Sequence, residues 1–348
     1  MTANAASLTG IMLYPLYCLF RLAVFFKNFA YNCGWKRPRK FPARTISIGG
    51  LTFGGAGKTP MTIFLAEFAL KHRKTLGAAA VISRGYRRFS KGLIIVSDGK
   101  KLRVSASEAG DELYLLAKRC PQAVVLADET RLTAADYAVN LAGCKIILLD
   151  DGFQRRKIHR DTDIVMLESH IVLSTSRFFT REPLAALRRA HAIVILDAEL
   201  KHRAEITRRI QAKSAALIFW GRRIPQKIIS LKDGAPISDE ALKYHSTAAF
   251  CALANPKSFA LTLNSLGIYP PEILAFPDHC RYNRQDLERI AQYFAASQAE
   301  ILLTTEKDAV KLPPILFNLP IFYLTISLEI EDAPRLMNLI FPHITVLT

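Results

Sequence analysis

The 348-residue sequence lacks several patterns that would assign it to a class at once. It has no Cys-x-x-Cys pair and no zinc-finger spacing, which excludes a cysteine metal cage and a disulfide framework. We therefore expect reduced thiols in a protein that faces the cytosol; the six cysteines are scattered at Cys18, Cys33, Cys120, Cys144, Cys251 and Cys280. No block of basic residues is interleaved with aromatic ones, so nucleic acid is not an expected partner. Internal repeats and low-complexity tracts are also missing.

Acidic residues are scarce relative to basic ones: 30 Asp and Glu stand against 47 Lys and Arg, a formal net charge of +17. Such a charge implies acidic partners, among them anionic lipid and phosphorylated substrates. Half of the residues are apolar, so the chain can bury a large interior. Its length favours two α/β domains over one.

The amino terminus lacks the basic flank of a signal peptide and the unbroken run of roughly 20 apolar residues of a spanning helix. Residues 8–31 are the most apolar stretch, but Pro15 and Arg21 interrupt them. We expect residues 1–40 to form a membrane-associated helical segment in the bilayer surface, with the basic residues 36–40 facing anionic headgroups. The alternative is a helix packed on the protein's own core. Whether the helix spans the bilayer or lies in it stays open.

A glycine-rich turn follows the β-branched run that contains Ile46 and Ile48, and residues 61–69 after it have helical spacing. This strand–loop–helix context is typical of a phosphate-binding loop, in which backbone N–H groups and the helix N-terminus bind phosphate. Lys58 would reach the β- and γ-phosphates and the Thr59 hydroxyl would bind Mg²⁺. The usual first glycine is missing, since Thr52 stands there. The residues predicted to bind nucleotide are Thr52, Gly54, Gly55, Ala56, Gly57, Lys58, Thr59 and Pro60.

Two adjacent acids, Asp150 and Asp151, follow four consecutive aliphatic residues. In phosphate-loop enzymes an acid at the end of such a strand holds Mg²⁺ or orients a water molecule. The alternative is an aspartate that caps the next turn. Further along, Arg181 and Glu182 form a pair that could face the nucleotide or each other. Which of the three acids contacts Mg²⁺ stays open.

Polar residues follow other predicted strands. Arg84 lies in a glycine-containing loop after the strand at 78–82, where doubly wound proteins place ligand contacts. Asp111 opens a helix, so simple capping could explain it. His279 follows a strand in the carboxyl-terminal part, and a lone histidine is most often an ordinary surface or core residue.

The alternation of strands and helices predicts an α/β fold: a mostly parallel sheet like that of P-loop NTPases, with helices on both faces. A composition shift at residues 201–213 and 220–225 marks a boundary. We therefore divide the chain into the segment 1–40, a nucleotide-binding domain at 41–218 and a smaller α/β domain at 219–348 that contributes to the active-site cleft.

Taken together, these motifs resemble those of one family, the tetraacyldisaccharide 4′-kinases (lipid A 4′-kinases) of Gram-negative bacteria. The resemblance covers nearly the whole chain and accounts for Thr52, because the family's loop carries threonine there. The shared motifs are the apolar amino terminus with Pro15, Leu-Thr-x-Gly-Gly-x-Gly-Lys-Thr-Pro at 51–60, Ser-Arg-Gly-Tyr at 83–86, Gly-Asp-Glu at 110–112, Leu-Asp-Asp-Gly-Phe-Gln at 149–154, Arg-Glu-Pro at 181–183, Asn-Pro at 255–256, Phe-Pro-Asp-His at 276–279 and Thr-Glu-Lys-Asp-Ala-Val-Lys at 305–311.

The resemblance implies transfer of the ATP γ-phosphoryl to the 4′-hydroxyl of a tetraacylated glucosamine disaccharide 1-phosphate in lipid A biosynthesis. It implies ATP and Mg²⁺ as cofactors, action at the cytoplasmic face of the inner membrane and an anionic membrane surface as partner. We expect a monomer, although the sequence leaves the oligomeric state open. The residues assigned on this basis are Asp111, His279 and Lys58 as catalytic; Thr59, Asp150, Asp151 and Glu182 as metal-binding; and Arg84, Tyr86 and Arg181 as substrate-binding. A carboxylate tuned by an imidazole could take the hydroxyl proton, and a pair drawn from two domains would form fully only on closure.

The chain departs from the family pattern in two places. Cys280 stands where a second histidine is frequent, and residues 174–180 differ from the usual glycine- and leucine-rich loop. Two other functions compete with the kinase. One is a membrane-attached P-loop ATPase or nucleotide switch without a lipid substrate, although N/T-K-x-D is missing because Lys307 and Asp308 are adjacent. The other is phosphoryl transfer to a soluble small molecule, which the apolar amino terminus disfavours.

Overall fold

The computed structural model describes residues 3–52, 57–174 and 180–342, and within them thirteen strands form one sheet. The strand order is β11-β10-β12-β13-β8-β7-β6-β1-β5-β2-β4-β3, with β9 paired to β8. Most neighbouring strands run parallel; in the described part of the chain the antiparallel pairs are β3–β4, β8–β9 and β8–β13. The α/β fold with a mostly parallel sheet, predicted from the sequence, is confirmed.

The large lobe carries the half of this sheet that runs from β7 to the edge strand β3, and the helices around it. Its strands are β1 (Arg44–Gly50), β2 (Ala79–Ser83), β3 (Ile94–Asp98), β4 (Val124–Ala127), β5 (Ile146–Asp150), β6 (Thr162–Glu168) and β7 (Ala192–Leu196). Its helices are α2 (Lys58–Lys71), α3 (Arg73–Leu76), α4 (Ala106–Ala109), α5 (Asp111–Arg119), α6 (Leu132–Asp136), α7 (Ser169–Leu173) and α8 (Leu200–Gln211), with a π-helical turn at Tyr137–Leu141 and a 3₁₀ turn at Leu184–Arg189.

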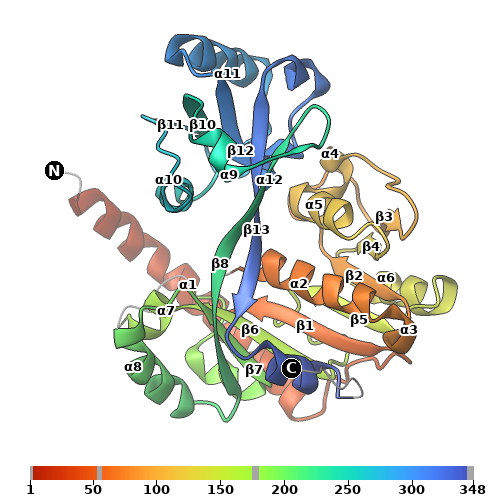
Figure 1. Ribbon diagram of the computed structural model, residues 1–348. Helices are drawn as coiled ribbons and strands as arrows, with labels where there is room; N and C mark the ends of the chain where they lie inside the picture. The colour runs from red at the N-terminus through yellow and green to blue at the C-terminus, as the bar shows by residue number, and fades with distance from the viewer. Residues whose placement is uncertain (1–2, 53–56, 175–179, 343–348) are drawn as a thin grey trace.

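The small lobe, residues 231–320, continues the sheet beyond two long strands (Figure 1). It contains β9 (Pro236–Ile237), β10 (Thr247–Cys251), β11 (Ile273–Ala275) and β12 (Ile301–Thr305). Its helices are α9 (Asp239–Leu242), α10 (Pro256–Ser265), α11 (Arg284–Ser297) and α12 (Glu306–Ala309), followed by a 3₁₀ turn at Pro314–Asn318.

Two long antiparallel strands, β8 (Leu217–Ser230) and β13 (Ile321–Ile330), form the ribbon that joins the lobes (Figure 1). The register shifts between Leu324 and Ile326, and there the Thr325 hydroxyl bonds to both backbone groups of Lys227, at 3.0 Å each. Residues 220–225, where a composition shift predicts a boundary, contain two arginines and a proline that hide the strand periodicity. The segment is the interior of β8, and the basic run before it is mainly helix α8.

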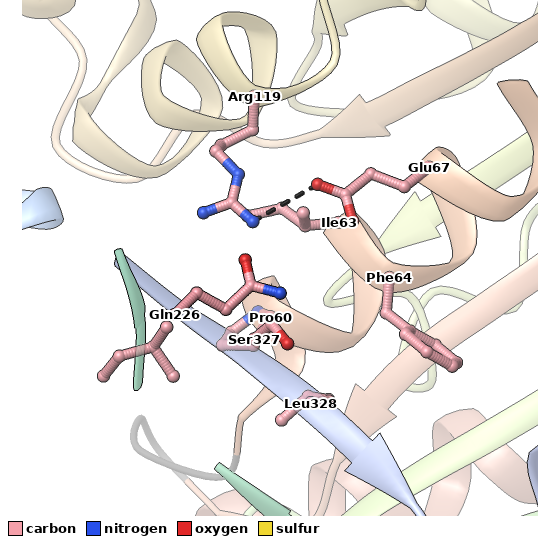
Figure 2. Close-up of a pocket in the computed structure, with 9 residues that line it drawn as sticks. Pro60, Ile63, Phe64, Glu67, Arg119, Gln226, Ser327 and Leu328 are labelled. Carbon is pink, nitrogen blue, oxygen red and sulfur yellow. Dashed lines mark hydrogen bonds and ion pairs between the residues drawn. The ribbon is translucent and has the colours of Figure 1, made fainter. Parts of the chain in front are cut away.

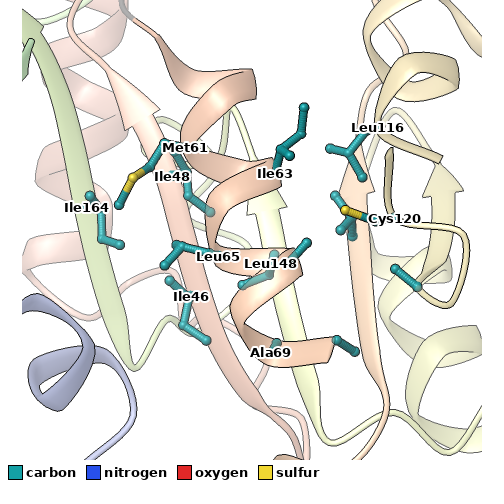
Figure 3. Packing of buried hydrophobic residues seen from close by; sticks show 14 of the residues in the cluster. Ile46, Ile48, Met61, Ile63, Leu65, Ala69, Leu116, Cys120, Leu148 and Ile164 are labelled. Atoms are coloured by element: carbon teal, nitrogen blue, oxygen red, sulfur yellow. The ribbon is translucent and has the colours of Figure 1, made fainter. Parts of the chain in front are cut away.

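The core of the large lobe lies between the sheet and α2. In Figure 3, Ile46 and Ile48 of β1 and Leu148 of β5 face Met61 and Leu65 of α2. Apolar spacing on α2 and β-branched residues in the strands make this packing possible, and burial of each such side chain stabilises the fold by roughly 1.5–3 kcal/mol. The last helix, α13 (Ala333–Ile340), returns to the same core rather than to the small lobe. The division at residue 218 stays a prediction.

Helix α1 (Ala3–Asn32) runs outward from the large lobe, with the N-terminus at its far end (Figure 1). Aromatic side chains on its carboxyl-terminal half are exposed, among them Phe25 at 61% and Phe26 at 59%. Trp35 follows at 77%. Within the described residues, no helix has the length and apolar character that crossing a bilayer would take.

Candidate active site

The phosphate-binding loop ends where α2 begins. Gly57 is the N-cap of α2 and has φ +77°, a left-handed backbone conformation that favours glycine. Lys58, Thr59 and Pro60 form the first turn of the helix, as predicted. Thr52 pairs with Thr180 in an isolated bridge. The predicted Gly54, Gly55 and Ala56 lie outside the described residues.

Asp150 is the last residue of β5, between β1 and β2, and is only 4% exposed. Its two carboxylate oxygens accept hydrogen bonds from Thr62 Oγ1 at 3.1 Å and Ser83 Oγ at 3.0 Å. Burial, together with the neighbouring charges of Glu112 and Asp151, raises the pKa of Asp150 to about 6. A cation placed beside this carboxylate would therefore be strongly favoured.

Asp151, the next residue, has a different environment. It turns the chain with φ +50° and lies 3.2 Å from Lys58 Nζ, while Arg181 Nη1 donates to both carboxylate oxygens at 2.7 Å. Burial opposes ionisation, but the charges of Lys58 and Arg181 outweigh it and lower the pKa of Asp151. This carboxylate stays ionised and holds the loop lysine next to the phosphate site.

Glu182, the third acid among the predicted metal ligands, already has hydrogen-bond partners. Both of its oxygens accept from Arg189, at 2.8 and 2.9 Å, and Asn28 of α1 donates to one of them at 2.8 Å. Among the described side chains, no three His, Cys, Asp or Glu residues converge as a metal cage. The arrangement fits Mg²⁺ held by Thr59 and one of Asp150 and Asp151, with phosphate oxygens and water as the other ligands. Metal binding by Glu182 stays a prediction that these contacts do not favour.

Asp111 and His279 come together, although 168 residues separate them. Asp111 opens α5 in the large lobe and His279 lies in the loop after β11 in the small lobe; His279 Nδ1 is 3.4 Å from Asp111 Oδ2. Gly110 precedes Asp111 with φ +86°, and a Cβ there would lie 2.7 Å from the Tyr86 carbonyl, so glycine allows the two loops to approach. The Tyr86 ring packs edge-on against the His279 ring at 5.3 Å.

Three arginines, Arg131, Arg155 and Arg181, interact electrostatically with Asp151, and a fourth, Arg84, lies close to Arg131 and Arg155. Arg181 binds Asp151 directly, and Arg84 is exposed at the end of β2. Arg131, which the sequence analysis left without a role, is 2% exposed and has φ +64°. Burial and the charge of Arg155 lower the pKa of Arg131 to about 10, with Arg84 adding to the effect. The position of Arg131 after a strand was the one sequence feature that could have pointed to the site. Nothing in the sequence shows that its guanidinium is buried.

A cavity of about 270 Å³ lies between α2 and the connecting ribbon (Figure 2). Arg119 of α5 points into it, 3.2 Å from Glu67 of α2, and also binds Glu306 of the small lobe at 3.2 Å. Gln226 and Leu328 line the side formed by the ribbon. Arg119 therefore connects three elements, α2, α5 and α12, across the two lobes.

The chain is similar to known proteins along almost its full length. Residues 9–345 match the family described as tetraacyldisaccharide-1-P 4′-kinase. The chain belongs to this family. Curated tetraacyldisaccharide 4′-kinases include those of Syntrophus aciditrophicus, 36% identical over 94% of this chain and 92% of its own, and Aquifex aeolicus, 34% identical over 94% and 97%. The crystal structure of the "apo" form of LpxK from Aquifex aeolicus in complex with ATP superposes with a TM-score of 0.78 at 32% identity, covering 95% of this chain and 98% of that one. The family predicted from the motifs is confirmed.

Proposed function

We propose that this chain transfers the γ-phosphoryl group of ATP to the 4′-hydroxyl of a tetraacylated glucosamine disaccharide 1-phosphate, the reaction for which its family is named. The observation that carries the proposal is the meeting of Asp111 and His279 from two lobes, on a protein whose lysine-bearing loop opens α2 nearby. A phosphate loop alone fits many nucleotide-binding proteins. A carboxylate–imidazole pair at the boundary between lobes adds a proton acceptor for a hydroxyl substrate.

ATP would lie with its β- and γ-phosphates against the start of α2. Backbone N–H groups around Gly57 and the ammonium of Lys58 would stabilise the phosphate oxygens. Mg²⁺ bound through Thr59 and one of the paired aspartates would neutralise charge on the β- and γ-oxygens. Asp151 already holds Lys58 at 3.2 Å, so the lysine is in place before nucleotide arrives.

The transfer itself needs a proton acceptor. The sugar oxygen forms a bond to the γ-phosphorus while the bond from that phosphorus to the bridging oxygen breaks, and ADP leaves. Asp111 takes the hydroxyl proton, and His279 orients the Asp111 carboxylate from the other lobe. Arg84, Tyr86 and Arg181 would contact the phosphorylated sugar. Tyr86 offers a ring face and 57% of its surface is exposed.

The substrate would reach the site from a membrane. The exposed aromatic residues of α1, the basic residues that follow it and the net charge of +17 all fit an anionic bilayer surface. We place the protein as a monomer at the cytoplasmic face of the inner membrane, with α1 in the interface. The segment 1–40 would bind the bilayer, residues 41–218 the nucleotide, and residues 219–348 would complete the cleft.

The test uses purified full-length protein, γ-labelled ATP, Mg²⁺ and the lipid A disaccharide precursor in anionic vesicles, with products separated by chromatography. We expect label in the lipid, at the 4′ position. Consumption of ATP that is equally fast with bare vesicles, with no labelled lipid, would contradict the proposal and favour an ATPase or nucleotide switch. Label transfer to a water-soluble sugar phosphate at the rate measured for the lipid would favour a soluble substrate.

A further inference from the structure

Lys307 occupies a position that the proposed reaction leaves without a role. It belongs to α12, which follows β12 in the small lobe, and its ammonium lies among three partners. His279 Nε2 is 3.2 Å away, Asp278 Oδ1 3.4 Å and Glu112 Oε1 3.9 Å. One side chain therefore contacts the histidine of the predicted pair and the two acids that flank the pair in sequence.

The chemistry of these contacts decides where the histidine carries its proton. An ammonium group has three N–H donors and no acceptor, so an imidazole nitrogen that bonds to it must offer a lone pair. Nε2 of His279 is that nitrogen. The proton of the neutral ring then lies on Nδ1, which faces Asp111 Oδ2 at 3.4 Å.

The other tautomer of His279, with the proton on Nε2, has no acceptor within hydrogen-bond distance of that proton. A proton on Nε2 would face the Lys307 ammonium, donor against donor. The closest acceptor on that side, Asp278 Oδ2, is 3.9 Å from Nε2, beyond hydrogen-bond distance. Nδ1 would then carry no proton, so the ring could not donate a hydrogen bond to Asp111.

The helix that carries Lys307 is held firmly. Thr305 caps it through the Asp308 N–H at 3.1 Å, and the fully buried Asp308 carboxylate accepts from the Ala252 N–H at 3.0 Å and forms an ion pair with Lys311 at 2.7 Å. These bonds anchor α12 to the strands of the small lobe. The two lysines of this segment thus divide their roles: Lys311 is buried against Asp308, and Lys307 is left to face the pair.

We propose that Lys307 is a positioning residue that holds His279 as the Nδ1–H tautomer, so that the ring donates to Asp111 and the Asp111 carboxylate remains the proton acceptor. This inference rests on the proposed function for its consequence in turnover, but the tautomer itself does not depend on it. The groups that face the His279 ring in the described structure are Asp111, Asp278, Lys307 and Tyr86, and Arg87 reaches its backbone carbonyl.

The first experiment reads the tautomer directly. Full-length protein labelled with ¹⁵N-histidine is compared with Lys307→Met and Lys307→Arg by NMR, and His279→Gln assigns the signal. We expect the wild-type ring to show Nδ1 protonated, Lys307→Arg to keep that state, and Lys307→Met to show a mixture or Nε2 protonated. An unchanged Nδ1–H signal in Lys307→Met would overturn the proposal. Because this measurement needs no substrate, it stands even if the lipid is not phosphorylated.

The second experiment separates positioning from phosphate binding. We expect Lys307→Met to lower kcat about 10- to 100-fold with KM for ATP changed less than twofold, and Lys307→Arg to restore most of kcat. In a His279→Gln background, Lys307→Met should have no further effect, because the lysine acts through the ring. A raised KM for ATP with unchanged kcat, or full additivity of the two substitutions, would overturn the proposal. Lys257→Met, on the exposed side of α10, is the control and should match wild type.

Discussion

The two acidic sites of this protein are built in opposite ways. The pair Asp150–Asp151 lies at one strand end of the large lobe, and its partners Thr62, Ser83 and Lys58 come from that lobe alone. The pair formed by Asp111 with a histidine takes one residue from each lobe and is positioned by loops and short helices. A parallel sheet therefore fixes the first site locally, while the second exists only when the lobes meet.

A site built within one lobe and a site shared by two lobes suit different functions. The site at the strand end holds charge at fixed distances, as phosphate and metal binding require. The inter-lobe site would open if the lobes moved apart, and proton transfer would then be restricted to the closed state in which substrate is enclosed. Substitutions in the two sites should therefore differ in kind, and the following predictions test that contrast.

The largest effect is expected at the inter-lobe site. Asp111→Asn removes the proton acceptor and keeps the shape, so phosphoryl transfer to the lipid should fall about 1,000-fold. ATP binding, measured by calorimetry, should change less than twofold, because the nucleotide contacts lie in the other site. Glu288→Gln, an exposed carboxylate on α11, is the control. A variant with normal lipid turnover would show that Asp111 is not the acceptor.

The strand-end site should respond through stability as well as activity. The pKa of Asp150 is raised to about 6 from 3.8, so between about pH 4 and pH 6 the folded protein holds a proton that the unfolded chain has lost. Wild-type stability therefore falls as the pH rises through this window. Asp150→Asn should remove that loss, making the magnesium-free variant up to about 3 kcal/mol more stable at pH 7.5 and equal to wild type near pH 4.

Urea unfolding at both pH values measures this difference. The exposed N-cap substitution Asp332→Asn should show no such pH dependence, since asparagine also caps. Equal differences between Asp150→Asn and wild type at the two pH values would contradict the assignment of the raised pKa.

A smaller effect is expected for the ion pairs that join the lobes. Arg119→Met leaves Glu306 mostly buried without its cation, and burial already raises the pKa of that carboxyl group. We expect the free energy of unfolding to fall by about 2 kcal/mol. The exposed pair of Arg222 and Glu329 on the ribbon is the matched control, and Arg222→Met should cost less than about 1 kcal/mol. Equal losses for the two variants would mean that Arg119 does not join the lobes energetically.

The smallest effect concerns α1, which lies outside both sites. Phe25→Ser removes an exposed aromatic ring, so binding to anionic vesicles should weaken about fivefold, roughly 1 kcal/mol. Sedimentation with vesicles measures it. Leu141→Ser, at a residue even more exposed than Phe25 but on the body of the large lobe, should bind as wild type does. If both variants bind equally well, α1 does not contact the bilayer through this ring.

More of the strand-end site than of the inter-lobe site could be predicted from sequence patterns. Four aliphatic residues before Asp150 and the glycines before Lys58 predict a strand, a loop and a helix from local physics alone. The opposite environments of Asp150 and Asp151 could not be predicted, since they depend on Thr62, Ser83 and Arg181, which arrive from distant segments. The resemblance to a family, and not spacing, joined Asp111 to His279.

Strand β8 of the connecting ribbon was missed for a related reason, whereas a strand at residues 321–328, the position of β13, was predicted. Residues 222–225 contain two arginines and a proline and pair with β13 alone. Only Arg222 among them is exposed, and alternation of apolar and polar residues is weak. Arg131 was missed because burial of a guanidinium is decided by its surroundings rather than by its neighbours in sequence.

Helix α13 follows every described strand in chain order, yet it covers the face of the sheet that contains β1. Phe341, just after α13, stacks on Phe68 of α2 at 5.4 Å, and Leu336 and Ile340 are buried in the same core. On the ribosome, the earliest strands to emerge must therefore wait for almost the whole chain before this face is closed. We expect ribosome-bound chains that stop short of α13 to be captured by chaperones that recognise apolar surface.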